Sequence, residues 1–212
     1  MKLYNYFRSS AAYRVRIALN LKGLKAENVF IHLQKNEQSA DEYLRVNAQG
    51  LVPALVDGDH TITQSLAIIE YLDETHPSPP LMPRTAAERA RVRSIALAIA
   101  CDIHPIDNLR VLRYLVNDLG LSEDQKNVWY AHWIVVGLSA LETMLSADER
   151  TGTFCHGDTP TLADICLVPQ LANARRGNVD LAPYPTLLRI DAACNALPAF
   201  ADAHPMKQPD AT

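Results

Sequence analysis

Hydrophobic and polar positions follow two different periods along the first 76 residues. Residues 2–6 alternate as a short strand does, and Val15, Ala18 and Leu19 then recur at helical spacing. Lys22-Gly23 predicts the end of this helix, because a glycine is the usual residue just past a helix end. Further on, the pattern predicts a strand over 26–33, a helix opened by a capping box at Ser39 and running to 46, a hairpin over 52–63, and an apolar-striped helix from 64–65 up to Pro77. The predicted order is β-α-β-α-β-β-α.

A proline-rich segment separates this part from the rest of the chain. Residues 76–83 contain four prolines, and such a run neither continues a helix nor pairs in a sheet. Capping boxes then open helical patterns at Thr85, Ser122 and Thr161, and Pro105 interrupts the first of them. With no strand evident after residue 85, we expect a domain over 1–76, a linker over 77–84 and an all-helical domain over 85–212.

Composition restricts the function classes. The 212-residue chain is 48% hydrophobic, with a formal charge of −4 and a pI near 6.0, which argues against a nucleic-acid binder. No apolar run approaches the ~18 residues of a spanning helix, so we expect no membrane segment. The cysteines form no Cys-x-x-Cys pair, and the seven histidines lack metal-ligand spacing. We therefore expect a cytoplasmic protein with reduced thiols and no metal.

The turn between the first strand and the first helix is the strongest candidate for chemistry. Ser9 and Ser10 stand where the helix begins, and serine caps a helix start by accepting a hydrogen bond from an unpaired backbone N–H. The partial positive charge of that end favours an anion. Because the turn contains no cysteine, any thiolate held there must come from a ligand. The alternative is that both serines only cap the helix.

Here the sequence resembles a known family. Ser9-Ser10, followed after three residues by Arg-Val-Arg-Ile-Ala-Leu, is similar to the N-terminal signature of zeta-class glutathione transferases, which include maleylacetoacetate and maleylpyruvate isomerases. The resemblance implies the glutathione transferase fold, with a thioredoxin-like α/β domain followed by an all-α domain. The family cysteine is replaced by Ala11. This should spare isomerisation, because glutathione brings the thiol, but it leaves activities such as haloacid dehalogenation open.

The resemblance also implies roles for particular residues. For glutathione they are Ser9, Ser10, Gln38, Val52 before a cis proline, Gln64, Ser65, His104 and Asn108. For catalysis they are whichever of Ser9 and Ser10 faces the sulfur, and Arg176 for the substrate. Because the implied substrates are dicarboxylates and the pocket needs cations, Arg8 beside the serines is a further candidate for catalysis and substrate binding, and Arg110 is a weaker third. Without the resemblance, His104 is an ordinary histidine, and Arg175-Arg176 is a solvated basic helix end.

The implied function is glutathione-dependent cis–trans isomerisation of a dicarboxylate by a homodimer. The sequence leaves open maleylpyruvate or maleylacetoacetate as substrate. Two alternatives remain at this point: a general transferase that conjugates glutathione to electrophiles, and a non-catalytic module with the same fold. The joint presence of Ser9, Ser10, Gln64 and Ser65 argues against the module, because a scaffold has no need of them together.

Overall fold

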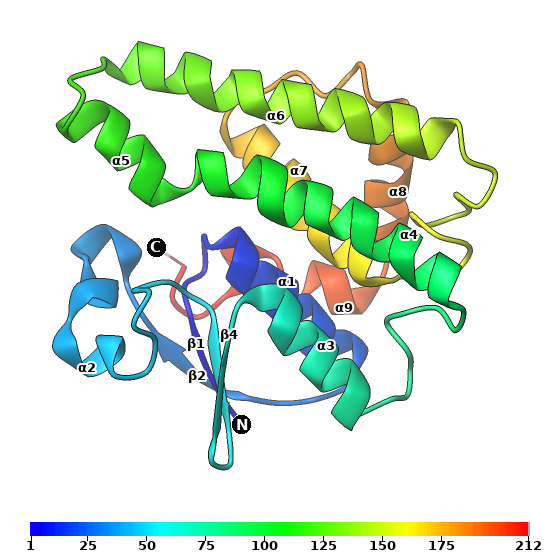
Figure 1. Cartoon of the computed structure of the whole chain (residues 1–212), viewed down its shortest axis with the longest axis horizontal. Helices are drawn as coiled ribbons and strands as arrows, with labels where there is room; N and C mark the ends of the chain where they lie inside the picture. Colours follow the sequence, from blue (N-terminus) through cyan, green and yellow to red (C-terminus); the bar gives the residue numbers. More distant parts are fainter. Residues whose placement is uncertain (212) are drawn as a thin grey trace. The chain divides into compact units, whose positions relative to one another are not determined.

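The computed structural model describes residues 1–211 and divides into two compact units. One unit comprises residues 1–81 together with the segment from Asn195 onward, and the other comprises residues 82–194. Figure 1 shows the chain from its blue N-terminus to its red C-terminus.

The first unit is built on a four-stranded mixed sheet. The strands β1 (Lys2–Asn5), β2 (Glu27–Phe30), β3 (Ala54–Asp57) and β4 (His60–Thr63) lie in the order β2-β1-β3-β4. Strand β1 pairs parallel with β2 and antiparallel with β3, which pairs antiparallel with β4. The helices α1 (Ser10–Leu21) and α3 (Ser65–Thr75) pack together on one side of the sheet, and α2 (Asp41–Leu44) lies on the other (Figure 1). The predicted β-α-β-α-β-β-α order and the thioredoxin-like domain are confirmed.

Two local predictions in this unit are wrong. The strand expected over 26–33 is only Glu27–Phe30, because it pairs with a four-residue β1, and a 3₁₀ turn at Leu33–Lys35 follows. The capping box expected at Ser39 does not form. Ser39 ends a second 3₁₀ turn, Glu37–Ser39, and Ala40, which has no side-chain acceptor, stands before α2 instead. In this loop the Glu37 carboxylate accepts the His32 backbone N–H at 2.7 Å.

The C-terminal segment packs on α1. The short helix α9 (Pro198–Ala201) contacts α1, and Arg16 donates from Nε to the Ala203 carbonyl at 3.1 Å. Asp210 Oδ2 accepts the backbone N–H of Phe7 at 2.9 Å, across 203 residues of sequence. The contacts therefore group this segment with the first unit, whereas the sequence had assigned everything from residue 85 onward to the helical domain.

The second unit is helical, and no strand occurs in residues 82–211. It contains α4 (Ala86–Leu97), α5 (Leu109–Asn117), α6 (Glu123–Ser146), α7 (Leu162–Arg176) and most of α8 (Pro185–Asn195). The capping boxes at Thr85, Ser122 and Thr161 are all present with both of their hydrogen bonds. The Thr161 box is buried and includes Asp164, which also accepts the Cys155 N–H at 2.7 Å and so fixes the loop before α7.

The chain between α4 and α5 is irregular. A π-helical turn covers Ala98–Ile103, and a 3₁₀ turn over His104–Asp107 contains Pro105. The irregularity thus begins six residues before His104 rather than at the proline itself. Ile103 packs on α6 at Gly137, where a Cβ atom would lie 2.3 Å from the isoleucine side chain. Glycine is required at position 137 for this approach. A π turn inside a helix often marks a functional segment.

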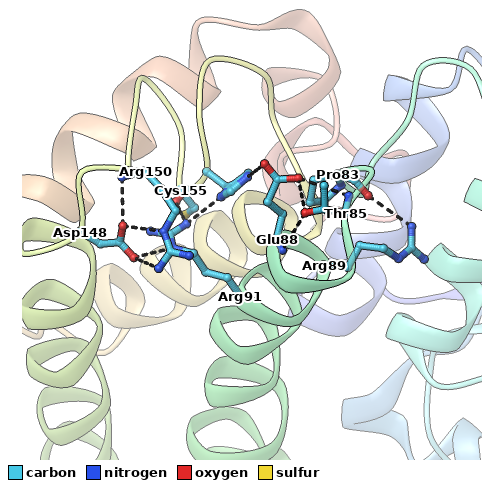
Figure 2. Close-up of polar contacts among 9 residues, drawn as sticks. Pro83, Thr85, Glu88, Arg89, Arg91, Asp148, Arg150 and Cys155 are labelled. Atoms are coloured by element: carbon cyan, nitrogen blue, oxygen red, sulfur yellow. Dashed lines mark hydrogen bonds and ion pairs between the residues drawn. The ribbon is translucent and has the colours of Figure 1, made fainter.

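A polar cluster centred on Arg91 holds α4 to the loop that follows α6 (Figure 2). Arg91 donates to Asp148 Oδ2 at 2.8 Å and to the Cys155 carbonyl at 2.7 Å, and Arg150 pairs with Asp148 at 2.7 Å. These hydrogen bonds hold the pKa of Asp148 well below its usual range. None of the residues singled out for chemistry lies here, so we interpret the cluster as structural.

Candidate active site

Ser9 caps α1 in the way the sequence predicts. Its backbone is extended (φ −69°, ψ 115°), and its Oγ accepts the Ala12 N–H at 3.2 Å. Because the oxygen is used as an acceptor there, the hydroxyl hydrogen is directed elsewhere and can be donated. Ser9 is partly exposed, whereas Ser10 is 6% exposed. This geometry favours Ser9 as the hydroxyl that meets a ligand. Arg8 is exposed, and its guanidinium carbon lies 5.1 Å from the Phe7 ring centroid.

A buried cation holds the turn that leads into Ser9. Arg16 donates to the carbonyls of Tyr6 and Phe7, at 3.5 and 3.1 Å. Burial lowers the pKa of Arg16 to about 10, so the guanidinium stays charged at neutral pH. Asp210 opposes that change and also accepts the Phe7 N–H. The position of Ser9 therefore depends on side chains from α1 and from the C-terminal segment.

Val52 lies beside the same turn. The Val52–Pro53 peptide bond is cis, as the resemblance implies. The preceding carbonyl, of Leu51, accepts from Tyr43 Oη and from Asn47 Nδ2, both at 2.6 Å. Val52, Tyr43, Phe7 and Tyr6 form one buried apolar cluster. This packing brings the loop before β3 next to the residues that precede Ser9.

Gln64 and Ser65 form the start of α3. Gln64 has a positive φ of 71°, which is uncommon for a residue with a side chain, and its Nε2 donates to Gln49 Oε1 at 2.8 Å. Ser65 is the first residue of α3 and is 6% exposed. No side chain caps this helix and its first turn has no acidic residue. The first amides of α3 are therefore suited to a carboxylate from a ligand.

The polar groups of the first unit fit a small acidic peptide. Gln38 Oε1 is buried and has no hydrogen-bond partner within residues 1–211, so it is an acceptor suited to a ligand donor. The uncapped start of α3 supplies donors for a carboxylate, and Ser9 supplies a hydroxyl donor at a helix start. Glutathione has amide N–H groups for the Gln38 acceptor, carboxylates for the start of α3, and a thiolate for the Ser9 hydroxyl.

His104 and Asn108 come together, but not on the face of a helix as the sequence predicted. His104 begins the 3₁₀ turn, and Asn108 has an extended backbone as the N-cap of α5. Asn108 Oδ1 accepts the Arg110 N–H at 3.1 Å, and its Nδ2 lies 3.3 Å from His104 Nε2. Arg110, in the first turn of α5, is exposed. The two side chains therefore lie next to each other as expected, although the backbone between them is irregular.

Arg176 and Arg175 have different surroundings at the end of α7. Arg176 is exposed, donates to Asn173 Oδ1 at 2.9 Å and hydrogen-bonds Tyr130 of α6. Arg175 pairs at 2.6 Å with Asp191, whose side chain is 6% exposed. The Arg175 side chain is itself 47% exposed, so Arg175 lies at a solvated helix end and also carries this ion pair. It ties α7 to α8.

Asp107 is a titratable group of this region that sequence reasoning missed. Both carboxylate oxygens are buried without a hydrogen-bond partner in the described part of the chain, and burial raises the pKa of Asp107 to about 7. It interacts electrostatically with Tyr130, whose own pKa is raised by burial and lowered in part by Arg176. The one sequence signal was its place between His104 and Asn108.

We predict that Asp107→Asn stabilises the protein at pH 8 but not at pH 5. The pKa is higher in the folded state than in the unfolded state, so stability falls as pH rises from about 4 towards 7, where the buried carboxyl must ionise. Asparagine removes this cost, which we put at about 1–2 kcal/mol because the residue is only half-buried. Urea unfolding at both pH values measures the difference. An equal change at the two values contradicts the assignment.

Comparison with known proteins identifies the family. Residues 1–74 match the family model described as "Glutathione S-transferase, N-terminal domain". A probable maleylacetoacetate isomerase of Vibrio cholerae is 53% identical, over 99% of this chain and 97% of its own. A holo structure of a bacterial maleylpyruvate isomerase, described as a zeta-class glutathione transferase, is 49% identical over the whole of both chains, with a TM-score of 0.98. This chain belongs to the zeta class of glutathione transferases.

A second structural neighbour contains bound ligands. The maleylacetoacetate isomerase of Methylobacterium extorquens AM1 is 45% identical over the whole of both chains, with a TM-score of 0.98. That structure contains malonate and glutathione. The glutathione transferase fold and membership of the isomerase-containing zeta class, both expected from Ser9-Ser10 and the residues after it, are thereby confirmed.

Proposed function

We propose that this zeta-class chain is a glutathione-dependent cis–trans isomerase acting on maleylpyruvate or maleylacetoacetate. The observation that carries the proposal is the Ser9 hydroxyl, which caps α1 through its oxygen in a turn without cysteine and so keeps its hydrogen for a ligand thiolate. The names of full-length relatives at 45–53% identity support the reaction class. The Ala11 position does not affect this assignment, because the thiol comes from glutathione.

Residues of the first unit hold and activate the cofactor. When bound, glutathione would supply a thiolate that adds to the conjugated double bond; the bond thereby becomes single and can rotate, and departure of the thiolate restores it as the trans isomer. The Ser9 hydroxyl and the start of α1 stabilise the negative charge on sulfur. The backbone at Val52 meets the peptide part, Gln38 accepts from it, and Gln64 and Ser65 hold the γ-glutamyl carboxylate at the start of α3. We propose His104 and Asn108, which belong to the second unit, as further glutathione-binding residues.

Arginines bind the substrate carboxylates. A guanidinium pairs with a carboxylate through two parallel hydrogen bonds and remains charged at any working pH. Arg176 and Arg8 are exposed and carry this role, with Arg110 as a third candidate. Their positive charge also stabilises the enolate that forms when the thiolate adds to the double bond. The malonate in the Methylobacterium structure supports a dicarboxylate site in this family.

A glutathione titration and an isomerase assay test the proposal. Calorimetry should show glutathione binding, and maleylpyruvate absorbance should decay with catalytic rather than stoichiometric glutathione. Consumption of glutathione in proportion to substrate would indicate a conjugating transferase. A chain that does not bind glutathione would be a non-catalytic module.

We propose that the enzyme is a homodimer and that α6 contributes to the interface. Val128, Val135 and Val136 on α6 are 70%, 40% and 49% exposed, and Val128 and Val135 are two turns apart on one face. Among the described residues, α6 is the one helix that is long and apolar enough to cross a membrane, whereas the sequence had predicted no membrane segment. One such helix is weak evidence for a membrane span, because the core helix of a soluble protein passes the same test. A second copy of this chain would cover the exposed valines.

Val135→Glu should weaken dimerisation by about 100-fold or more, because a charge would be buried in an apolar contact. Sedimentation velocity over a dilution series measures the dimer dissociation constant. Asn127→Glu, which adds a charge at another exposed position of α6, is the matched control and should leave the dimer intact. Equal behaviour of the two variants would remove this face from the interface.

We place the enzyme in the cytoplasm. Cys155, Cys166 and Cys194 are buried and Cys101 is exposed. The cysteine pattern has neither a disulfide framework nor a metal spacing, which fits a reducing compartment. Small-molecule dicarboxylates are the proposed partners, and we propose no nucleic-acid or membrane partner.

A further inference from the structure

Helix α1 buries two arginines, and the proposed mechanism uses neither of them on a ligand. Arg14 is 2% exposed and Arg16 is 5% exposed. Arg16 donates to backbone carbonyls and holds the turn before Ser9. Arg14 instead reaches a side chain: its Nη1 lies 3.3 Å from the Oγ of Ser65, 51 residues later and at the start of α3.

This hydrogen bond has a single possible direction. A guanidinium can only donate, so Arg14 is the donor and the Ser65 oxygen is the acceptor. The hydroxyl hydrogen of Ser65 is then left to be donated to a different acceptor. In the absence of Arg14, the hydroxyl could rotate and donate into the protein instead.

The surroundings of Ser65 suit a carboxylate as that acceptor. The first turn of α3 has no acidic residue and Gln64 makes no side-chain cap, so the unpaired amides of this turn and the Ser65 hydroxyl are donors at the same helix end. The charge of Arg14 lies next to the Ser65 oxygen in a buried environment, where electrostatic interactions are stronger than in water. One cation thus supports both the orientation and the polarity of the Ser65 donor.

We propose that Arg14 is a positioning residue that orients the Ser65 hydroxyl as a donor to the γ-glutamyl α-carboxylate of glutathione. The inference rests on the proposed function, because it takes glutathione as the ligand. Arg14 acts through Ser65. A positioning role differs from a purely structural role in one measurable way: the contribution of Arg14 to binding disappears when the ligand lacks that carboxylate.

The test compares two ligands on matched variants. Calorimetry measures binding of glutathione and of γ-aminobutyryl-cysteinyl-glycine, which lacks only the α-carboxylate. Arg14→Met keeps an apolar stem but removes the charge and donors, and it should weaken glutathione binding by about 10- to 100-fold while changing the analogue by less than about twofold. Ser65→Ala should show the same selectivity. The double variant should bind glutathione about as weakly as the worse single variant, because the two residues act in series.

The other possible results contradict either the role of Arg14 or the proposed function. Equal weakening of both ligands, or no weakening of either, shows that Arg14 only supports the fold and overturns the inference while the proposed function stands. Absence of glutathione binding by the wild-type protein overturns both. If Arg14→Met does not fold, Arg14→Lys replaces it. The lysine variant should lose part of the affinity for glutathione alone, and an equal loss for the analogue overturns the inference.

Discussion

Ser9→Ala lowers kcat/KM for isomerisation by on the order of 100-fold or more, the size of effect seen when a donor to a developing anion is removed. The reason lies in the direction of the hydrogen bonds: the Ser9 oxygen accepts from Ala12, and its hydrogen is available to the glutathione sulfur. Ser10→Ala should change the rate by only a few-fold, because Ser10 is buried as the first residue of α1. The thiolate absorbance of bound glutathione should fall with Ser9→Ala alone.

Capping and catalysis can be separated at position 9. Ser9→Ala also removes an N-cap, which costs about 1 kcal/mol of stability. Ser9→Asp keeps a capping acceptor but places a negative charge beside the sulfur, so it should preserve stability and lose activity. Ser9→Thr keeps both the acceptor and the hydroxyl and should retain most of the rate. Full activity in Ser9→Asp would mean that the residue is only a cap.

Arg176→Ala should reduce kcat/KM by roughly 2–4 kcal/mol, through a lost charge-paired contact with a substrate carboxylate. Glutathione affinity should stay nearly constant. Arg176→Lys should recover only part of the loss, because an ammonium group cannot reproduce the paired hydrogen bonds of a guanidinium. Steady-state kinetics with maleylpyruvate and calorimetry with glutathione give the two quantities.

Arg175→Ala is the control, and it should change stability but not substrate binding. It removes the 2.6 Å ion pair with the buried Asp191, so the free energy of unfolding should fall by about 1–2 kcal/mol, while KM for the substrate stays unchanged. The two neighbouring arginines would then differ in kind, one affecting catalysis and the other stability. Equal small effects on KM would remove Arg176 from the substrate site.

The sequence by itself determined the features that depend on neighbouring residues. The capping boxes at Thr85, Ser122 and Thr161 formed as predicted, because each is closed within four residues. The order of strands and helices in the first unit and the Ser9 cap follow from the same local patterns. The family signature after Ser9 then identified the fold and the cofactor.

Only the tertiary structure decided the features that depend on distant partners. The strand expected over 26–33 stops at Phe30, because its length is set by pairing with β1. The Ser39 box failed where the loop formed 3₁₀ turns instead. The contacts of Phe7 with Asp210, Arg14 with Ser65 and Arg175 with Asp191 join segments 16 to 203 residues apart. Periodicity reports which side of an element is buried, but long-range packing alone determines which buried or charged side chains meet.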